Sequence, residues 1–159
     1  MSFQDWIFSV HLLFAATLVG GLFMSWIVVV ALWLAPDAEA TSSLSRVAVV
    51  ATGAIAIGLP GVIALGIWLA LLRPQLHPWH GWAIAAIVLW AITAAAVARA
   101  TLEYAKSTRM ARELISAGQP GPNAELTALN RSLTGLLFRA VASVAIVLIV
   151  IDMVYKPGA

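Results

Sequence analysis

Four long apolar stretches constrain this sequence more than any other feature. They cover about residues 6–34, 47–72, 81–98 and 136–155, and a helix needs ~20 predominantly apolar residues to cross a bilayer. The apolar residues run continuously rather than alternating with polar ones, which disfavours strands. Hydrophobic residues make up 62% of the chain and charged residues 10%, which excludes a soluble domain and a disordered chain. We therefore expect an all-α membrane protein, residues 1–159 forming one four-helix transmembrane bundle in the lipid bilayer.

Basic residues are divided unevenly between the segments that connect these stretches. Loops 1–2 and 3–4 and their flanks carry seven, namely Arg46, Arg99, Lys106, Arg109, Arg112, Arg131 and Arg139. The other side has Arg73 and Lys156. Because cytoplasmic loops carry an excess of Lys and Arg, we expect loops 1–2 and 3–4 to be cytoplasmic. Both termini and loop 2–3 then face outward from a bacterial-type inner (plasma) membrane.

The segment between the third and fourth stretches, about residues 99–135, is helical in character. Its charged residues are spaced to pair along a helix over residues 101–117; the pairs are Glu103 with Lys106 and Arg109 with Glu113. The run Gly-Gln-Pro-Gly-Pro-Asn at residues 118–123 then breaks the helix. We expect the third helix to extend beyond the membrane as far as this break.

A new helix is predicted after the break. Asn123 is a suitable N-cap for a helix that starts at Ala124, and Leu126, Leu129 and Leu133 give it an apolar stripe. The third and fourth helices should thus form a cytoplasmic hairpin. This hairpin is either a solvated, charged structure or an arm that docks a partner.

Small residues in the second stretch predict close helix packing. Ala54, Gly58 and Gly61 share one helix face, and small residues let helices approach closely in lipid. This face could pack within the bundle or in a homodimer. Pro60 should loosen the helix, either for packing or to open space for a ligand. The expected inward faces are His11, Ala15, Leu18, Leu22 and Ser25 in the first stretch, and Ala142, Ala145, Ile149 and Asp152 in the fourth.

Ionisable residues gather toward the outer end. They are Asp5, His11, Arg73, His77, His80, Asp152 and Lys156, and they include all three histidines of the chain. His11 lies about one helical turn inside the membrane boundary, and ionisable groups at membrane depth usually mark function. Asp152 follows an apolar run and needs a partner, for which Lys156, Arg73 and His11 are the candidates.

Three interpretations of the histidines follow. His11 could be an axial ligand of a b-type haem, because imidazole suits haem iron. His77 and His80, with His11 and a carboxylate, could instead bind copper or zinc. Otherwise His77 and His80 are interfacial loop residues, and His11 is hydrogen-bonded inside the bundle. The absence of cysteine excludes iron–sulfur clusters, thiolate zinc sites and thioether-linked haem, and the net charge of +2 gives no reason to expect nucleic acid.

Three short motifs carry a family resemblance. The run from His11 to Phe23 resembles the first span of a group of small four-helix membrane proteins. That group contains the HemJ-type protoporphyrinogen oxidases, the copper-resistance D (CopD) domain, and a related family of predicted integral membrane proteins of unknown function. Leu59-Pro60-Gly61, followed by Gly66-Ile67-Trp68-Leu69, is similar to their second span, and Met153 to Gly158 is similar to their ending.

The resemblance implies a four-helix bundle and, from the HemJ-type enzymes, haem bound through His11. It also implies an essential lysine early in the third span, but residues 81–86 contain none. The Asn-Glu-x-Pro element expected before the fourth span is absent too, since residues 130–133 read Asn-Arg-Ser-Leu. Protoporphyrinogen oxidase activity is therefore not expected, and the chain is most similar to the uncharacterised family. For copper handling, Met24, Met110 and Met153 form no cluster of soft ligands.

The sequence therefore favours a membrane protein that binds a b-type haem near its outer face through His11. Asp152, Lys156 and Arg73 would form the supporting polar cluster, and the role would be electron transfer with a membrane redox partner. One alternative is a cofactor-free accessory or assembly subunit. Another is a transporter of copper, another metal ion or a small solute, which would need dimerisation because four helices are few to enclose a pore.

Overall fold

The computed structural model describes residues 3–72 and 81–155, and these are almost entirely helical. The helices are α1 (Phe3–Trp33), α2 (Ala38–Leu72), α3 (Gly81–Ser116), α4 (Ala124–Asn130) and α5 (Leu133–Tyr155). Four segments are long and apolar enough to cross a membrane, namely α1, α2, α3 and the α4–α5 segment Ala124–Tyr155. The prediction of an all-α protein with four spans is confirmed.

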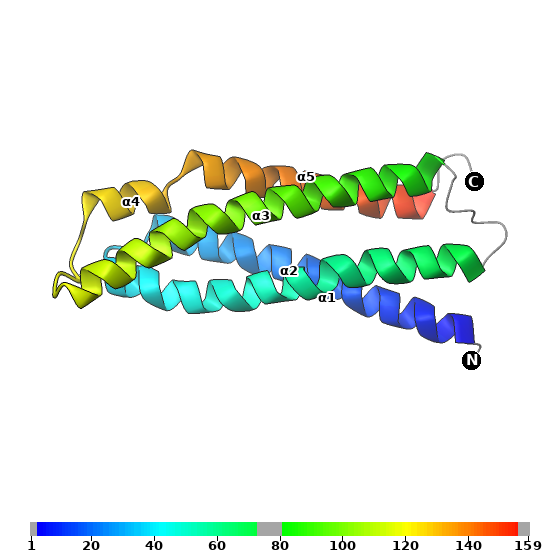
Figure 1. Ribbon diagram of the computed structural model, residues 1–159, viewed down its shortest axis with the longest axis horizontal. Coiled ribbons are helices and arrows are strands. Elements are labelled where there is room, and N and C mark those ends of the chain that lie inside the picture. Colours follow the sequence, from blue (N-terminus) through cyan, green and yellow to red (C-terminus); the bar gives the residue numbers. More distant parts are fainter. Residues whose placement is uncertain (1–2, 73–80, 156–159) are drawn as a thin grey trace.

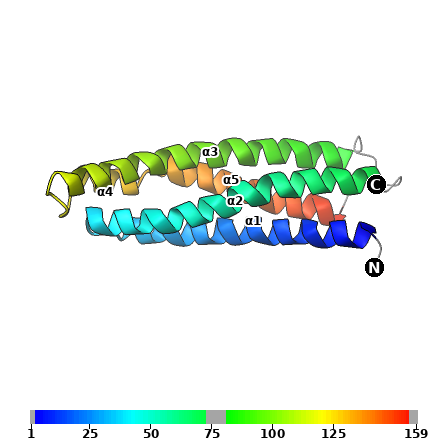
Figure 2. The ribbon, with the colours of Figure 1, turned by 60° about the horizontal axis from the view of Figure 1, so that its bottom comes forward.

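The long helices run side by side as an elongated antiparallel bundle (Figures 1 and 2). Helix α1 packs mainly on α2, and α5 packs mainly on α3, while α2 and α3 join the two pairs. The start of α1 and the end of α5 lie at one end of the bundle, and the α1–α2 and α3–α4 connections lie at the other (Figure 1). Loops 1–2 and 3–4 are thus at the same end, as the predicted topology requires.

Glycines bring α1 and α2 into close contact. A Cβ atom on Gly58 would lie 2.8 Å from the backbone nitrogen of Leu18, and one on Gly61 would overlap the Phe14 ring. On α1, a Cβ atom on Gly21 would lie 2.9 Å from the Cβ atom of Ala54. The small-residue face of α2 therefore packs inside the bundle against α1.

Helix α2 continues through Pro60. Next to the proline, the indole Nε1 of Trp90 on α3 donates a hydrogen bond to the Leu59 carbonyl over 2.9 Å. This bond ties α3 to α2 at a depth where lipid offers no hydrogen-bond partner.

Two helix boundaries depend on local hydrogen bonds. Helix α2 begins at Ala38, earlier than the predicted start near residue 47, because Asp37 Oδ1 accepts a hydrogen bond from the Ala40 amide over 2.8 Å. Helix α3 runs unbroken to Ser116, as predicted. It ends at Gly118, whose φ of 72° allows the Gln119 amide to reach the Leu114 carbonyl over 2.9 Å.

The hairpin is confirmed in part. Asn123 caps α4, since its Oδ1 accepts from the Leu126 amide over 3.0 Å. The predicted stripe is wrong at Leu133, which is 74% exposed, whereas Leu126 is 2% exposed. The helix breaks after Asn130, and the Ser132 hydroxyl then accepts a hydrogen bond from the Gly135 amide over 3.3 Å. The side chains of α5 therefore do not continue the helical face of α4.

Helix α4 is docked on the rest of the chain. Leu126 forms a small core with Ala38 and Ala111, which are both fully buried. Asn130 bridges two helices: its Nδ2 donates to Thr41 Oγ1 on α2 over 2.9 Å, and its Oδ1 accepts from Ser107 on α3. The Leu126 side of the hairpin is thus occupied by its own chain. Both predicted pairs form, Arg109–Glu113 (3.5 Å) between exposed side chains and Glu103–Lys106 (2.8 Å) with a Glu103 side chain that is 18% exposed.

Candidate functional site

His11 lies on the inward side of α1 and is partly buried. Its imidazole faces α2, where it interacts with the Val62 backbone and lies against Gly66. A Cβ atom on Gly66 would be 3.5 Å from His11 Cε1, so the glycine lets the ring approach the α2 backbone. The Nδ1 atom of His11 is buried and forms no hydrogen bond of normal geometry with any described residue.

An apolar cavity begins at Ala15, one helical turn along α1 from His11, and is lined by all four long helices. Its walls include Ala15 and Leu18 from α1, Leu59 and Val62 from α2, Trp90 from α3, and Ile149 and Met153 from α5. A second apolar cavity, lined by Gly66, Ala70, Trp82 and Met153 among others, continues toward the end of the bundle where α2 ends and α3 begins. The two cavities share Ile63, Ala86 and Met153. His11 lines neither of them, but it contacts Gly66, which lines the second.

Asp152 lies on the inward side of α5, as predicted, and is partly buried. Its Oδ2 atom is buried and has no hydrogen-bond partner among the described residues. The structure thus places His11 and Asp152 in the half of the bundle that holds the start of α1 and the end of α5, without a bond between them. Their other predicted partners, Arg73 and Lys156, lie outside the described residues.

The proposed metal ligands His77 and His80 also lie outside the described residues. Within residues 3–72 and 81–155, no group of three or more His, Cys, Asp or Glu side chains could hold a metal ion. The prediction of a metal site in loop 2–3 therefore stays a prediction.

A second polar centre, which the sequence reasoning missed, surrounds Arg139. Its Nη1 atom donates a hydrogen bond to the Ser25 carbonyl on α1 over 2.6 Å. The guanidinium carbon also lies 4.4 Å from the centroid of the Tyr104 ring on α3, a distance at which a cation is attracted by the ring face. Arg139 was counted with the basic residues that flank the spans, but its side chain points into the bundle. The spacing in the sequence could have indicated this inward direction, because Arg139 lies one turn before the buried Ala142 on the same helix face.

The same level of the bundle holds a second polar link between α1 and α5. The indole Nε1 of Trp26 donates to Ser143 Oγ over 2.9 Å, and that hydroxyl donates to the Arg139 carbonyl over 2.8 Å. Two cavities flank the guanidinium, with Ser25, Thr52, Thr101 and Tyr104 among their lining residues. This layer therefore brings a guanidinium, several hydroxyl groups and a phenol together inside the bundle.

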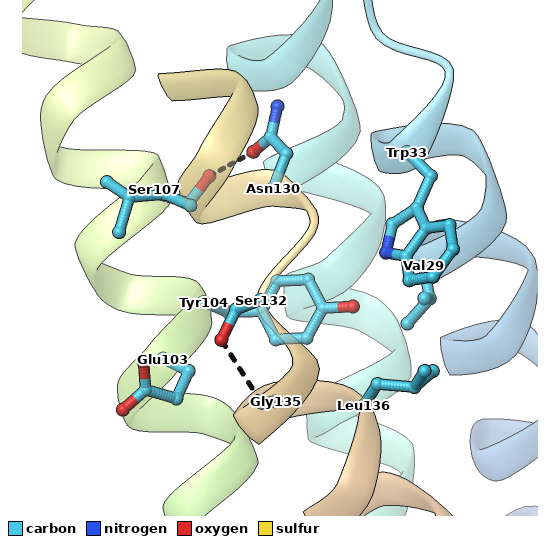
Figure 3. A pocket seen from close by; sticks show the side chains of 10 residues that line it. Val29, Trp33, Glu103, Tyr104, Ser107, Asn130, Ser132, Gly135 and Leu136 are labelled. Atoms are coloured by element: carbon cyan, nitrogen blue, oxygen red, sulfur yellow. Dashed lines mark hydrogen bonds between the residues drawn. The ribbon is translucent and has the colours of Figure 1, made fainter. Parts of the chain in front are cut away.

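Another pocket lies at the base of the hairpin, between α1, α3, α4 and α5 (Figure 3). Its lining residues include Trp33, Glu103, Tyr104, Asn130 and Ser132. Tyr104 also lines one of the cavities beside Arg139. Tyr104 therefore lines both the pocket at the base of the hairpin and a cavity beside Arg139.

A family model described as "Predicted integral membrane protein (DUF2269)" matches residues 6–157. No curated protein and no solved structure matches the chain significantly.

Proposed function

We propose that this chain, which belongs to the DUF2269 family of predicted integral membrane proteins, holds a b-type haem through His11 and supports electron transfer to or from a membrane redox partner. The observation that carries the proposal is the position of His11. It is an ionisable residue within a membrane-spanning helix, and its Nδ1 atom is buried with no hydrogen bond of normal geometry to a described residue. An apolar cavity begins one helical turn away, at Ala15.

The chemistry of the surroundings fits such a group. Ionisable side chains in membrane spans usually face the bundle interior and serve a function, and a neutral imidazole is a common haem ligand. The cavity that begins one turn from His11 has almost entirely apolar walls from four helices, and apolar side chains are the partners that the faces of a macrocycle would contact. A bound haem would supply one-electron redox chemistry.

The residues of this chain would have distinct roles. His11 would hold the group, and the Val62 backbone would orient the imidazole. Gly66 keeps the ring close to α2. Asp152, with Arg73 and Lys156, would form the polar surroundings at the outer end of the cavity.

Titration of the purified, detergent-solubilised protein with haem tests the proposal. We expect a saturable Soret band at one haem per chain, and we expect His11→Ala to abolish it. The double variant His77→Ala/His80→Ala is the matched control, because it removes the other two histidines and should keep the Soret band.

Two results would overturn the proposal. One is a wild-type protein that stays colourless in excess haem, which favours a cofactor-free accessory subunit. The other is a His11→Ala variant that binds haem as the wild type does. Elemental analysis of the same preparations for copper and zinc, with loss of metal only in the double variant, would support the metal site instead.

A further inference from the structure

Arg139 brings a positive charge into the bundle without a negative partner. Within residues 3–72 and 81–155 the ion pairs are Glu103–Lys106 and Arg109–Glu113, and Arg139 takes part in neither. Its recorded contacts are the Ser25 carbonyl and the Tyr104 ring. A guanidinium has five N–H donors, so most of its hydrogen-bonding capacity remains for another acceptor.

The helices that pack around Arg139 do not neutralise it. On α3, the Glu103 carboxylate is bound to Lys106 at 2.8 Å, and the Arg99 guanidinium lies over the Phe138 ring at 5.7 Å. On α2, the charged residue nearest in sequence to Thr52 is Arg46, which is exposed. An uncompensated charge inside a bundle is costly, so binding an anion here would be favourable.

Further hydrogen-bond donors line the cavity beside the guanidinium. Thr52 and Tyr104 line it together with Arg139, and neither hydroxyl forms a recorded hydrogen bond with another described residue. Ser25 and Thr101 also line the cavities, but their hydroxyls already donate to the Leu22 and Val97 carbonyls. Among the residues named here, the side chains of Arg139, Thr52 and Tyr104 are therefore the ones whose hydrogen-bond donors can bind a ligand in the cavity.

The cavity also has a polar neighbour on the side of the hairpin. The pocket in Figure 3 is lined by Glu103, Asn130 and Ser132 and reaches Tyr104, which is a wall of the Arg139 cavity as well. Polar side chains thus extend from the hairpin base to the guanidinium.

We propose that Arg139, with Thr52 and Tyr104, forms a binding site for an oxyanion of the phosphate or carboxylate type. The planar fork of a guanidinium matches the oxygens of such groups, and the two hydroxyls can donate to the same oxygens. A dissolved anion and the phosphate of an anionic lipid share this chemistry. The site is separate from the proposed haem site, since Ser25 lies roughly 20 Å along α1 from His11 at ~1.5 Å per residue.

Calorimetric titration of the detergent-solubilised protein tests the site with inorganic phosphate and with acetate, at constant ionic strength. Native mass spectrometry with phosphatidylglycerol, against phosphatidylcholine, tests the lipid source. We expect one saturable site for at least one of the anionic probes. Arg139→Gln should weaken that binding by about tenfold or more, because it removes a charge-assisted contact.

Arg109→Gln is the matched control, because the Arg109 side chain is 78% exposed, and it should bind as the wild type does. Thr52→Leu keeps the guanidinium but fills the cavity, so it should also lose binding even if Arg139→Gln fails to fold. Haem titration of Arg139→Gln should still give a Soret band if the two sites are separate. The proposal is overturned if the wild type binds none of the anionic probes, or if folded Arg139→Gln or Thr52→Leu binds them as tightly as the wild type.

Discussion

At the scale of single residues, His11 on α1 and Arg139 on α5 are ionisable side chains that turn inward within segments apolar enough to span a membrane. His11 interrupts a long apolar run, so its burial could be predicted from position alone. Arg139 lies near the start of α5, where a long basic side chain can equally extend to the membrane surface. Its inward direction depends on the Ser25 carbonyl, a partner 114 positions away in the sequence, which no local pattern reveals.

The glycines of the α1–α2 interface give a prediction at the same scale. Gly58→Ala should lower the free energy of unfolding by about 1–3 kcal/mol, because the added Cβ atom would meet the Leu18 backbone at 2.8 Å. Gly20→Ala is the control, since nothing lies within 4 Å of its added Cβ atom. It should be neutral or stabilise the helix slightly. Equal stabilities of the two variants in denaturant titrations in detergent would contradict this packing.

At the scale of elements, the long helices could be predicted and their breaks only in part. Lipid requires each span to satisfy its own backbone, so an apolar run of this length has to be a helix. The cap at Asn123 was also visible in the sequence. The break between α4 and α5 was not visible in the sequence. It depends on the Ser132 hydroxyl, which accepts a hydrogen bond from the Gly135 amide.

The docking of α4 is testable with two leucines. Leu126→Ala should cost about 2–5 kcal/mol locally and speed hydrogen exchange in α4, because Leu126 is 2% exposed in the core with Ala38 and Ala111. Leu133→Ala removes the same atoms from a side chain that is 74% exposed, and it should leave that exchange unchanged. Fast exchange of α4 in the wild-type protein would show that the hairpin is solvated rather than docked.

At the scale of the whole molecule, the structure joins the two basic loops at one end of the bundle. The Ala38 amide donates to the Pro120 carbonyl over 3.1 Å, which links the α1–α2 connection to the loop after α3. The distribution of basic residues then predicts which side of the membrane this end faces. The pairing of α3 with α5 follows from the predicted hairpin. The pairing of α2 with α1 could not be predicted, because every span is apolar on most of its surface and the small-residue face of α2 could equally have served a homodimer.

The absence of cysteine makes the orientation simple to test. Single cysteines introduced by Gln75→Cys and Gln119→Cys can be treated with an impermeant thiol reagent on intact cells. We expect labelling of the first variant only, and labelling of the second after the membrane is opened. The reverse pattern would mean that loops 1–2 and 3–4 face outward.

Gly21 on α1 and Gly58 on α2 each lie in close contact with the facing helix. This contact limits which substitutions the sequence can accept. Lipid is as apolar as a leucine side chain, so exposed positions such as Phe23 and Val49, each 69% exposed, can exchange one apolar residue for another. Gly21 and Gly58 have no such freedom, because any side chain there would meet the facing helix. A saturation mutagenesis scan scored for protein abundance should therefore show tolerance to hydrophobic substitution across the outer surface and intolerance along this narrow seam.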